Sequence, residues 1–554
     1  MRAPRRLLAL AARLSRAPGL VLALLVAIIA IAPPGEARAA TLRVASAFDP
    51  QTMDPHSVAL LYQTRVVFQL YEGLVGRDEH DALAPALATR WELVEPTTWR
   101  FHLRAGVRFH DGTPFTADDA VFSLQRALAP PSGRAYLLKG VRSVRRVEPL
   151  TLDVQLHEPD AVFPDKLVLV AMMSQAWAKE HGVERAQDFD ARQETYALRN
   201  ANGTGPYRLE RYEPDIRTVL RENPLWWGRA DRRNGNVDSA FFVTIRSDAT
   251  RLAALNSGEV DLVLDPPYQA IDSLRHHPAF SVTQVDGLST SMLAFDQRAP
   301  PAAAASQPAA ARNPFLDLRV RRAVYLAINV DLIIQKVLRG LGTSAGLPFA
   351  PRMEGQLPDL DARQRFDPRA ARELLAQAGW PDGFDVEFDC VNAPYRVRVC
   401  EAIAAMLTQV GIRAHLRTWQ GAQFFPMITH GTIRLAEFGY LSTFDAWQSL
   451  NGLLHTWDAR GAGAFNAGRY SNARLDALIE AVRTESAPAA RRALVGRALR
   501  IVADDLPYVP LYHFVLSWAM RREVQVVMMP EDVLPLRWTR IHTPMPLAVP
   551  RDSR

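Results

Sequence analysis

Strand-like and helix-like segments alternate along almost the whole chain, and this pattern restricts the fold more than any other feature of the sequence. Residues 41–45 and 99–104 alternate between apolar and polar side chains, as strands with one buried face do. Thr116-Ala-Asp-Asp119 then opens a helix, because the threonine can cap it and the acidic pair suits its positive end. Such alternation predicts an α/β fold built from layers of helices and sheets.

Later segments repeat the pattern in a chain whose composition is that of a folded protein. The 554 residues are 48% apolar and 22% charged, with length for roughly three or four domains of ~150 residues each. The helices predicted here are one capped by Asp248 and ended by Gly258, one begun by Asp367-Pro368 and ended by Gly379, and one from about Cys400 to Val410. The strands predicted beside them are 260–264, 386–389 and 412–417.

The first 39 residues have the layout of a secretory signal peptide. An arginine-rich leader precedes an apolar run over residues 20–32, and Ala37-Arg38-Ala39 supplies small residues for cleavage after Ala39. The alternative is a retained N-terminal anchor helix. Removal of residues 1–39 leaves 59 basic and 58 acidic residues, so the basic charge belongs mostly to the leader. The charge therefore gives no reason to expect a nucleic-acid partner.

A search for catalytic motifs finds no strong match. The sequence has no Gly-Lys dipeptide for a phosphate loop, no His-Glu-x-x-His zinc motif and no Gly-x-Ser-x-Gly nucleophile motif. Gly340-Leu-Gly342 fits a dinucleotide pattern by letters, but a helix-like segment precedes it where that chemistry needs a strand, so we expect a loop. The absence of these motifs does not exclude an enzyme, because catalytic residues can be distant in sequence, but it makes one less expected.

The sequence has two cysteines, Cys390 and Cys400. In an exported protein two cysteines this close most simply form one disulfide. It would join the end of the strand at 386–389 to the start of the following helix, and closing so small a loop is worth on the order of 2–3 kcal/mol. A metal site would need more ligands nearby than the sequence offers.

Eight segments in order make the chain resemble a known family. They are 71–75, 83–91, 99–104, 109–122, 202–207, 222–228, 313–323 and 470–476. Together they are similar to the extracellular solute-binding proteins of family 5, the dipeptide, oligopeptide and nickel group of ABC importers, cluster C type. The resemblance implies a two-lobed periplasmic-binding-protein-like α/β fold (type II) with an inserted domain. It also implies two connecting strands between the lobes, near 288–294 and 509–513.

The resemblance further implies a division of the chain. The expected parts are a signal peptide at 1–39, lobe I at 40–83, an inserted domain II at 84–204, more of lobe I at 205–290, lobe II at 291–511, and the rest of lobe I at 512–554.

The resemblance implies a periplasmic monomer that is not an enzyme and holds no metal or cofactor. It would capture a peptide-like small solute or short peptide between two closing lobes. It would then deliver the solute to the membrane permease subunits of an ABC importer. One alternative is the same fold binding a metal chelate, a sugar or an opine. The other is a secreted hydrolase.

The first segment that resembles the family's ligand contacts follows a strand. In it Asn392 can donate and accept hydrogen bonds, Tyr395 offers an aromatic face, and Arg396 offers a planar fork for a carboxylate. Relatives often carry Asn-Asp-Arg here, whereas this chain has Asn392-Ala393-Pro394. Arg396 is therefore either a displaced anchor for a ligand carboxylate or a solvated loop arginine.

The second such segment runs from residue 438 to residue 446. Tyr440 stands where relatives usually carry tryptophan, and Ser442 and Thr443 stand where some peptide binders place an anchoring aspartate. Asp445 either anchors a ligand ammonium or caps the next helix, and we favour the cap. Trp419 is expected either to add an apolar wall to the cleft or to pack in the core.

Overall fold

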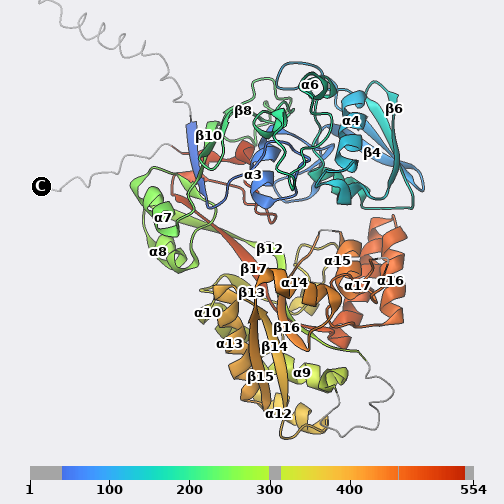
Figure 1. Cartoon of the computed structure of the whole chain (residues 1–554), viewed down its shortest axis with the longest axis vertical. Coiled ribbons are helices and arrows are strands. Elements are labelled where there is room, and N and C mark those ends of the chain that lie inside the picture. Colours follow the sequence, from blue (N-terminus) through green and yellow to red (C-terminus); the bar gives the residue numbers. More distant parts are fainter. Residues whose placement is uncertain (1–39, 299–312, 444, 460, 543–554) are drawn as a thin grey trace, which may run out of the picture.

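The protein has two α/β lobes, drawn one above the other in Figure 1. The computed structural model describes residues 40–298, 313–443, 445–459 and 461–542. The upper lobe holds the N-terminal half of the described chain together with its last strands, and the lower lobe holds most of the C-terminal half. The predicted signal peptide lies outside the described residues. Among the helices described, none is long and apolar enough to cross a membrane.

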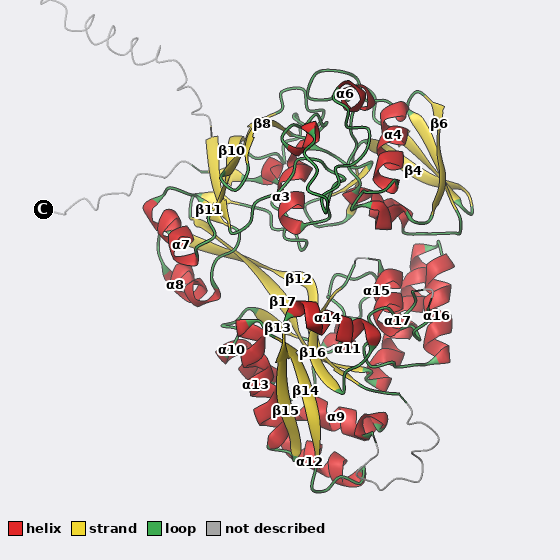
Figure 2. Cartoon of the chain, viewed as in Figure 1, coloured by secondary structure: helices red, strands yellow, loops and turns green. Residues whose placement is uncertain are grey.

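One sheet extends through both lobes, in the order β15-β14-β16-β12-β17-β11-β1-β10-β9-β8, with β13 paired to β17. The two central strands, β12 (Phe280–Phe295) and β17 (Tyr508–Arg521), pair antiparallel, and their register shifts between Asp286 and Thr290. Figure 2 shows this pair of strands running from the upper lobe into the lower one. The predicted type of fold, with lobes joined by two connecting strands, is confirmed.

The upper lobe contains one end of this sheet. β1 pairs in parallel with β10 and β11, and β10 pairs antiparallel with β9. The strands are β1 (Ala40–Ser46), β8 (Tyr207–Glu213), β9 (Arg217–Glu222), β10 (Val237–Thr244) and β11 (Leu262–Val263); the helices beside them are α3 (Leu61–Leu70), α7 (Asp248–Ser257) and α8 (Ile271–His276). The prediction that Asp248 caps α7 is wrong by one residue, because the hydroxyl of Ser247 accepts the Thr250 N–H. Gly258 ends α7 at a φ of 78°.

A second sheet of the upper lobe has its own core. It runs β4-β5-β7-β6, and apolar residues of α4 pack against it. The strands of this sheet are β4 (Ala88–Glu95), β5 (Thr98–Leu103), β6 (Val141–Glu148) and β7 (Thr151–Leu156), and the helices of this part of the chain are α4 (Ala117–Leu128), α5 (Phe163–Lys166) and α6 (Gln175–Glu180). β2 (Val75–Arg77) and β3 (Leu83–Pro85) pair with each other in a separate two-stranded sheet. Thr116 begins α4 as predicted, and its N–H donates to the Asp119 carboxylate at 2.9 Å. The position of the β4-β5-β7-β6 sheet in the chain fits the predicted inserted domain II, whose boundaries stay a prediction.

The lower lobe contains the other end of the large sheet, covered by helices on both sides (Figure 2). β14 pairs in parallel with β15 and β16. The strands are β13 (Gly342–Ser344), β14 (Phe384–Val391), β15 (Ile412–Trp419) and β16 (Leu435–Leu441). The first group of helices is α9 (Leu318–Ala327), α10 (Val330–Lys336), α12 (Pro368–Gln377) and α13 (Pro394–Thr408); the second is α11 (Pro358–Asp361), α14 (Gly421–His430), α15 (Ala446–Leu454), α16 (Ala473–Thr484) and α17 (Pro488–Asp505).

Three predictions about local structure in this lobe can be compared with the structure. Asp367 caps α12 and accepts the N–H groups of Arg369 and Ala370. The third helix does not begin near Cys400, because α13 already starts at Pro394, a residue that the first turn of a helix tolerates. The expected loop at Gly340-Leu-Gly342 is wrong at its last residue, because Gly342 begins β13, which pairs with β17. The segment follows α10 and therefore lacks the strand-to-helix turn of a dinucleotide site.

Candidate solute-binding site between the lobes

The predicted contact residues gather where the strands of the lower lobe end toward the upper lobe. Asn392 follows β14 and is exposed, and its N–H donates to the Trp419 carbonyl at 2.7 Å. Tyr440 lies near the end of β16, the neighbouring strand, and Ser442, Thr443 and Asp445 follow that strand. Because the carboxyl ends of neighbouring parallel strands meet at one edge of a sheet, open α/β sheets bind ligands there. We call this region, with the facing part of the upper lobe, the inter-lobe site.

Arg396 is not a solvated loop arginine. It lies in the first turn of α13, and its Nη1 donates to both carboxylate oxygens of Glu437 on β16, at 3.2 and 3.1 Å. Glu437 is fully buried and also accepts the Ser291 hydroxyl at 2.6 Å. Burial by itself lowers the pKa of Arg396, but the Glu437 carboxylate outweighs it and raises the pKa above its ordinary value. The arginine therefore stays charged and is neutralised by its own lobe.

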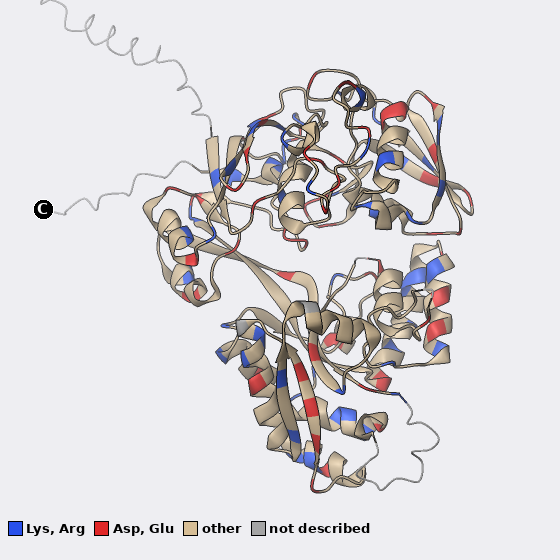
Figure 3. Ribbon diagram, in the orientation of Figure 1, with Lys and Arg blue, Asp and Glu red and all other residues tan. Residues whose placement is uncertain are grey.

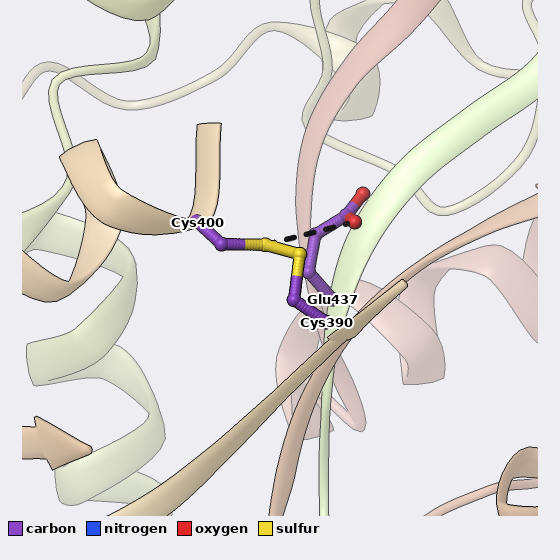
Figure 4. A group of neighbouring side chains, drawn as sticks. All are labelled: Cys390, Cys400 and Glu437. Carbon is purple, nitrogen blue, oxygen red and sulfur yellow. Dashed lines mark hydrogen bonds between the residues drawn. A yellow bond between two sulfur atoms is a disulfide. The ribbon is translucent and has the colours of Figure 1, made fainter. Parts of the chain in front are cut away.

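The predicted disulfide is present beside this ion pair. Cys390 at the end of β14 and Cys400 in α13 are bonded, as Figure 4 shows. Their sulfur atoms and the Glu437 carboxylate lie close enough together to suggest a metal site. Bonded sulfurs are not thiolates, however, so this group does not offer the ligands that a soft metal requires.

Tyr268 of the upper lobe reaches this position from the segment before α8. Its ring meets that of Tyr395 edge to face, with centroids 5.9 Å apart. The sequence reasoning missed Tyr268, and only its place just after a strand end, in Pro266-Pro267-Tyr268, was a signal for it.

The upper lobe holds a buried arginine near Tyr268. Arg65 of α3 pairs with Asp265 and Asp532, and its side chain is 2% exposed. Asp265 also accepts the Ser46 hydroxyl at 2.8 Å. These contacts tie α3 to the ends of β1 and β11, which face the lower lobe.

Tyr440 does not present an open ring, contrary to the expectation for this position. Its side chain is 8% exposed and packs against Phe349 and Phe465, and its hydroxyl donates to the Ser449 carbonyl at 3.2 Å. Phe465 is 45% exposed, so it presents the open aromatic face beside Tyr440. Sequence reasoning missed Phe465 because it lies in a loop far along the chain.

The polar groups after Tyr440 bond within the lower lobe. Ser442 is buried, and its hydroxyl accepts the Ala350 N–H at 3.2 Å. The Thr443 hydroxyl donates to the Asp445 carbonyl at 2.9 Å. Trp419 packs against the core, and its indole N–H donates to the Asp389 carboxylate at 2.8 Å. Of its two predicted roles, core packing is therefore the one that these contacts support.

Asp445 caps α15, as favoured from the sequence. Its Oδ1 accepts the Trp447 N–H at 2.9 Å and the Arg491 guanidinium at 2.8 Å. Its Oδ2 is buried and accepts no hydrogen bond from the described residues. Burial raises the pKa of Asp445 to about 7, although Arg491, and Lys166 of the upper lobe, oppose the shift.

The upper lobe also approaches this second segment. Lys166 of α5 pairs with Asp160 at 2.5 Å, and both act on the pKa of Asp445. Nearby, Arg483 of α16 forms an ion pair with Glu158 of the upper lobe. Both lobes therefore contribute side chains around the end of β16.

The structure also has a groove and a small cavity. A groove of about 580 Å³ lies between α8 and α10, lined by Asp272, Arg275, Asp331 and Arg339 among others. Its lining does not include the predicted contact residues, which belong to the ends of β14 and β16. Phe48 and Arg65 line a small cavity in the upper lobe.

Comparison with known proteins decides the family. The model of the bacterial extracellular solute-binding proteins, family 5 Middle, matches residues 82–461. The chain belongs to this family.

Relatives of this family 5 protein span most of its length. Heme-binding protein A of Haemophilus influenzae is 28% identical, over 78% of this chain and 79% of its own. The dipeptide-binding protein of Escherichia coli is 26% identical, over 86% of this chain and 89% of its own. Among solved structures, HbpA2 from Haemophilus parasuis has a TM-score of 0.78 at 22% identity, covering 91% of this chain and 100% of that one. The unliganded open form of MppA has a TM-score of 0.76 at 21% identity, with 91% and 98% covered.

Membership in family 5 agrees with the arrangement of the predicted residues. The structure brings Asn392, Tyr395 and Arg396 to one end of the lower sheet, and places Ser442 and Asp445 at the end of β16. Which of them touch a solute stays a prediction.

Proposed function

We propose that this family 5 protein is the periplasmic substrate-binding component of an ABC importer. It captures a peptide-like small solute between its two lobes and delivers it to membrane permease subunits. The observation that carries this proposal is the connection of the lobes by β12 and β17, with Tyr268 of one lobe against Tyr395 of the other. A solute that contacts both lobes favours the conformation in which they approach, whereas a solute that contacts one lobe shifts nothing.

The relatives support a solute-binding role without chemistry on the solute. Their names include dipeptide-binding and di/tripeptide-binding proteins, and one solved relative holds the peptide Met-Leu. Export through the predicted signal peptide fits the disulfide between Cys390 and Cys400, because disulfides persist outside the reducing cytosol. The ATP-driven work would be done by other subunits of the importer.

A non-peptide solute is the second candidate, and one observation favours it. Ser442 and Thr443 stand where some peptide binders place an anchoring aspartate, and Asp445 is engaged by α15 and Arg491. Relatives include a heme-binding protein and a protein solved with agropinic acid. The site could therefore hold a solute that lacks a free ammonium group.

Ligand-dependent unfolding temperature separates these candidates. We expect a library of di- and tripeptides to raise the unfolding temperature of the mature protein, because a ligand that binds only the folded state stabilises it. A response to sugars, opines or nickel–histidine in place of peptides would favour the second candidate. Conversion of a bound compound into products would contradict both and indicate a hydrolase.

A further inference from the structure

Three charged side chains at the inter-lobe site, Arg396, Arg65 and Asp445, have ion-pair partners within their own lobes. Arg396 pairs with Glu437, and Arg65 pairs with Asp265 and Asp532. The same holds at the end of β16, where Asp445 pairs with Arg491 at 2.8 Å. These ion pairs are buried or nearly so.

Such pairs are poor anchors for the charged ends of a free peptide. A ligand carboxylate that approaches Arg396 also meets the carboxylate of Glu437, and an ammonium that approaches Asp445 also meets the Arg491 guanidinium. The charged group of the solute would lose its hydration on binding. The ion pair that it meets is almost neutral overall, so the attraction to this pair offsets little of the desolvation cost. Asn392, in contrast, is exposed and uncharged, and its amide can pair with a neutral amide.

Several large apolar side chains are also exposed around the ends of β16, β1 and β11. Tyr268 is 46% exposed, Leu441 at the end of β16 is 65% exposed and Phe465 is 45% exposed. Phe48, which follows β1 and stacks on Tyr62, is 54% exposed. Such residues come from both lobes, and clustered exposed apolar side chains are typical of a surface that binds an apolar partner.

We propose that the inter-lobe site takes an uncharged, aromatic-rich solute, recognised by ring contacts from both lobes and by neutral hydrogen bonds. This inference rests on the proposed function and names the class of solute. A peptide with blocked ends and aromatic side chains meets the description, and so does a planar aromatic molecule that is not a peptide.

The first test compares peptides that differ only in their ends or only in their side chains. Binding of triphenylalanine, of its N-acetylated and C-amidated form, and of trialanine is measured by calorimetry with the mature protein. We expect the free and blocked aromatic peptides to bind within about threefold of each other, and trialanine at least about tenfold more weakly. Either a loss of about tenfold or more on blocking, or binding of trialanine as tight as that of triphenylalanine, would overturn the inference.

A non-peptide probe separates failure of the inference from failure of the proposed function. N-phenylnaphthylamine is uncharged and fluoresces when bound in apolar surroundings. If N-phenylnaphthylamine binds while no peptide does, the inference of an uncharged aromatic solute is supported, and the proposal of a peptide-like solute is wrong. If trialanine or nickel–histidine binds while every uncharged aromatic probe fails, the solute class is wrong and the binding role stands. If none of these probes binds, both are wrong.

Substitutions of two exposed phenylalanines test whether these residues contribute to binding. Phe465→Ala and Phe48→Ala are each expected to weaken binding of the blocked aromatic peptide, or of N-phenylnaphthylamine, by about five- to tenfold. Phe366→Ala is the matched control, since this phenylalanine is 38% exposed and lies beside α12, away from the site. Unchanged affinity in both site variants, with circular dichroism showing that they are folded, would overturn the inference.

Discussion

Tyr268 and Tyr395 meet edge to face across the two lobes, with ring centroids 5.9 Å apart. One ring comes from the segment before α8 and the other from the first turn of α13, so the contact depends on how the lobes are placed. In Figure 3 the positions of Lys, Arg, Asp and Glu are spread along the ribbons of both lobes. The ring contact is one that the two lobes share near the strands that connect them.

Loss of this ring contact should loosen the arrangement of the lobes. An edge-to-face pair is worth about 0.5–1.5 kcal/mol beyond its buried area, which is enough to change the population of open and closed forms. In small-angle X-ray scattering, Tyr268→Ala is expected to give a larger radius of gyration than the unsubstituted protein without solute. Tyr196→Ala is the control, because Tyr196 is 45% exposed and contacts rings of the upper lobe. Equal scattering from both variants would contradict the prediction.

Glu437→Gln should destabilise the fold strongly. It leaves the Arg396 guanidinium, whose side chain is 14% exposed, without its carboxylate, and breaking a buried ion pair typically costs about 3–5 kcal/mol. Chemical denaturation measures the loss. The double variant Glu437→Gln with Arg396→Gln should recover part of it, since no unpaired charge remains. Losses that simply add would show that the two residues do not act as a pair.

The same substitution should change which solutes bind. With Glu437 neutral, Arg396 is free to pair with a ligand carboxylate through a charge-assisted hydrogen bond. Calorimetry on folded Glu437→Gln is therefore expected to show free triphenylalanine gaining affinity relative to its C-amidated form. An unchanged ratio would mean that Arg396 does not reach the solute.

Asp445→Asn should alter the dependence of stability on pH. The pKa of Asp445 is raised to about 7 from the ordinary value of 3.8, so the folded protein binds a proton that the unfolded chain has released between these values. Stability contributed by this group is therefore present below about pH 4 and falls as the pH rises to about 7. The free energy of unfolding of the unsubstituted protein, minus that of Asp445→Asn, should fall over this range. A difference independent of pH would contradict the raised pKa.

Removal of the disulfide should cost stability without changing the charges at the site. Cys390 and Cys400 are separated by 10 positions, and cross-linking so short a loop stabilises by roughly 2–3 kcal/mol. Cys390→Ala with Cys400→Ala is expected to lower the denaturation midpoint by a corresponding amount. Reduction of the unsubstituted protein should give a similar loss, and mass spectrometry before reduction should find the two cysteines linked. Two free thiols in the exported protein would contradict the bond.

Features that depend on neighbouring residues could be predicted from the sequence. The caps at Thr116 and Asp367, the end of α7 at Gly258 and the pairing of two nearby cysteines follow from contacts a few residues apart. The α13 start was missed, although Pro394 was the signal for it. The α/β class followed from periodicity, which is also local.

The sequence by itself determined the alternation of strands and helices, the ends of a few helices, the cysteine pair and the family, because short-range backbone preferences and ordered motifs decide these. Only the tertiary structure decided that Glu437 neutralises Arg396, that Tyr440 is buried while Phe465 is open, and that Tyr268 reaches Tyr395. These contacts join residues on different strands, helices and lobes. Which strands become neighbours, and how the lobes are placed, depends on burying apolar surface across the whole chain, which no local pattern specifies.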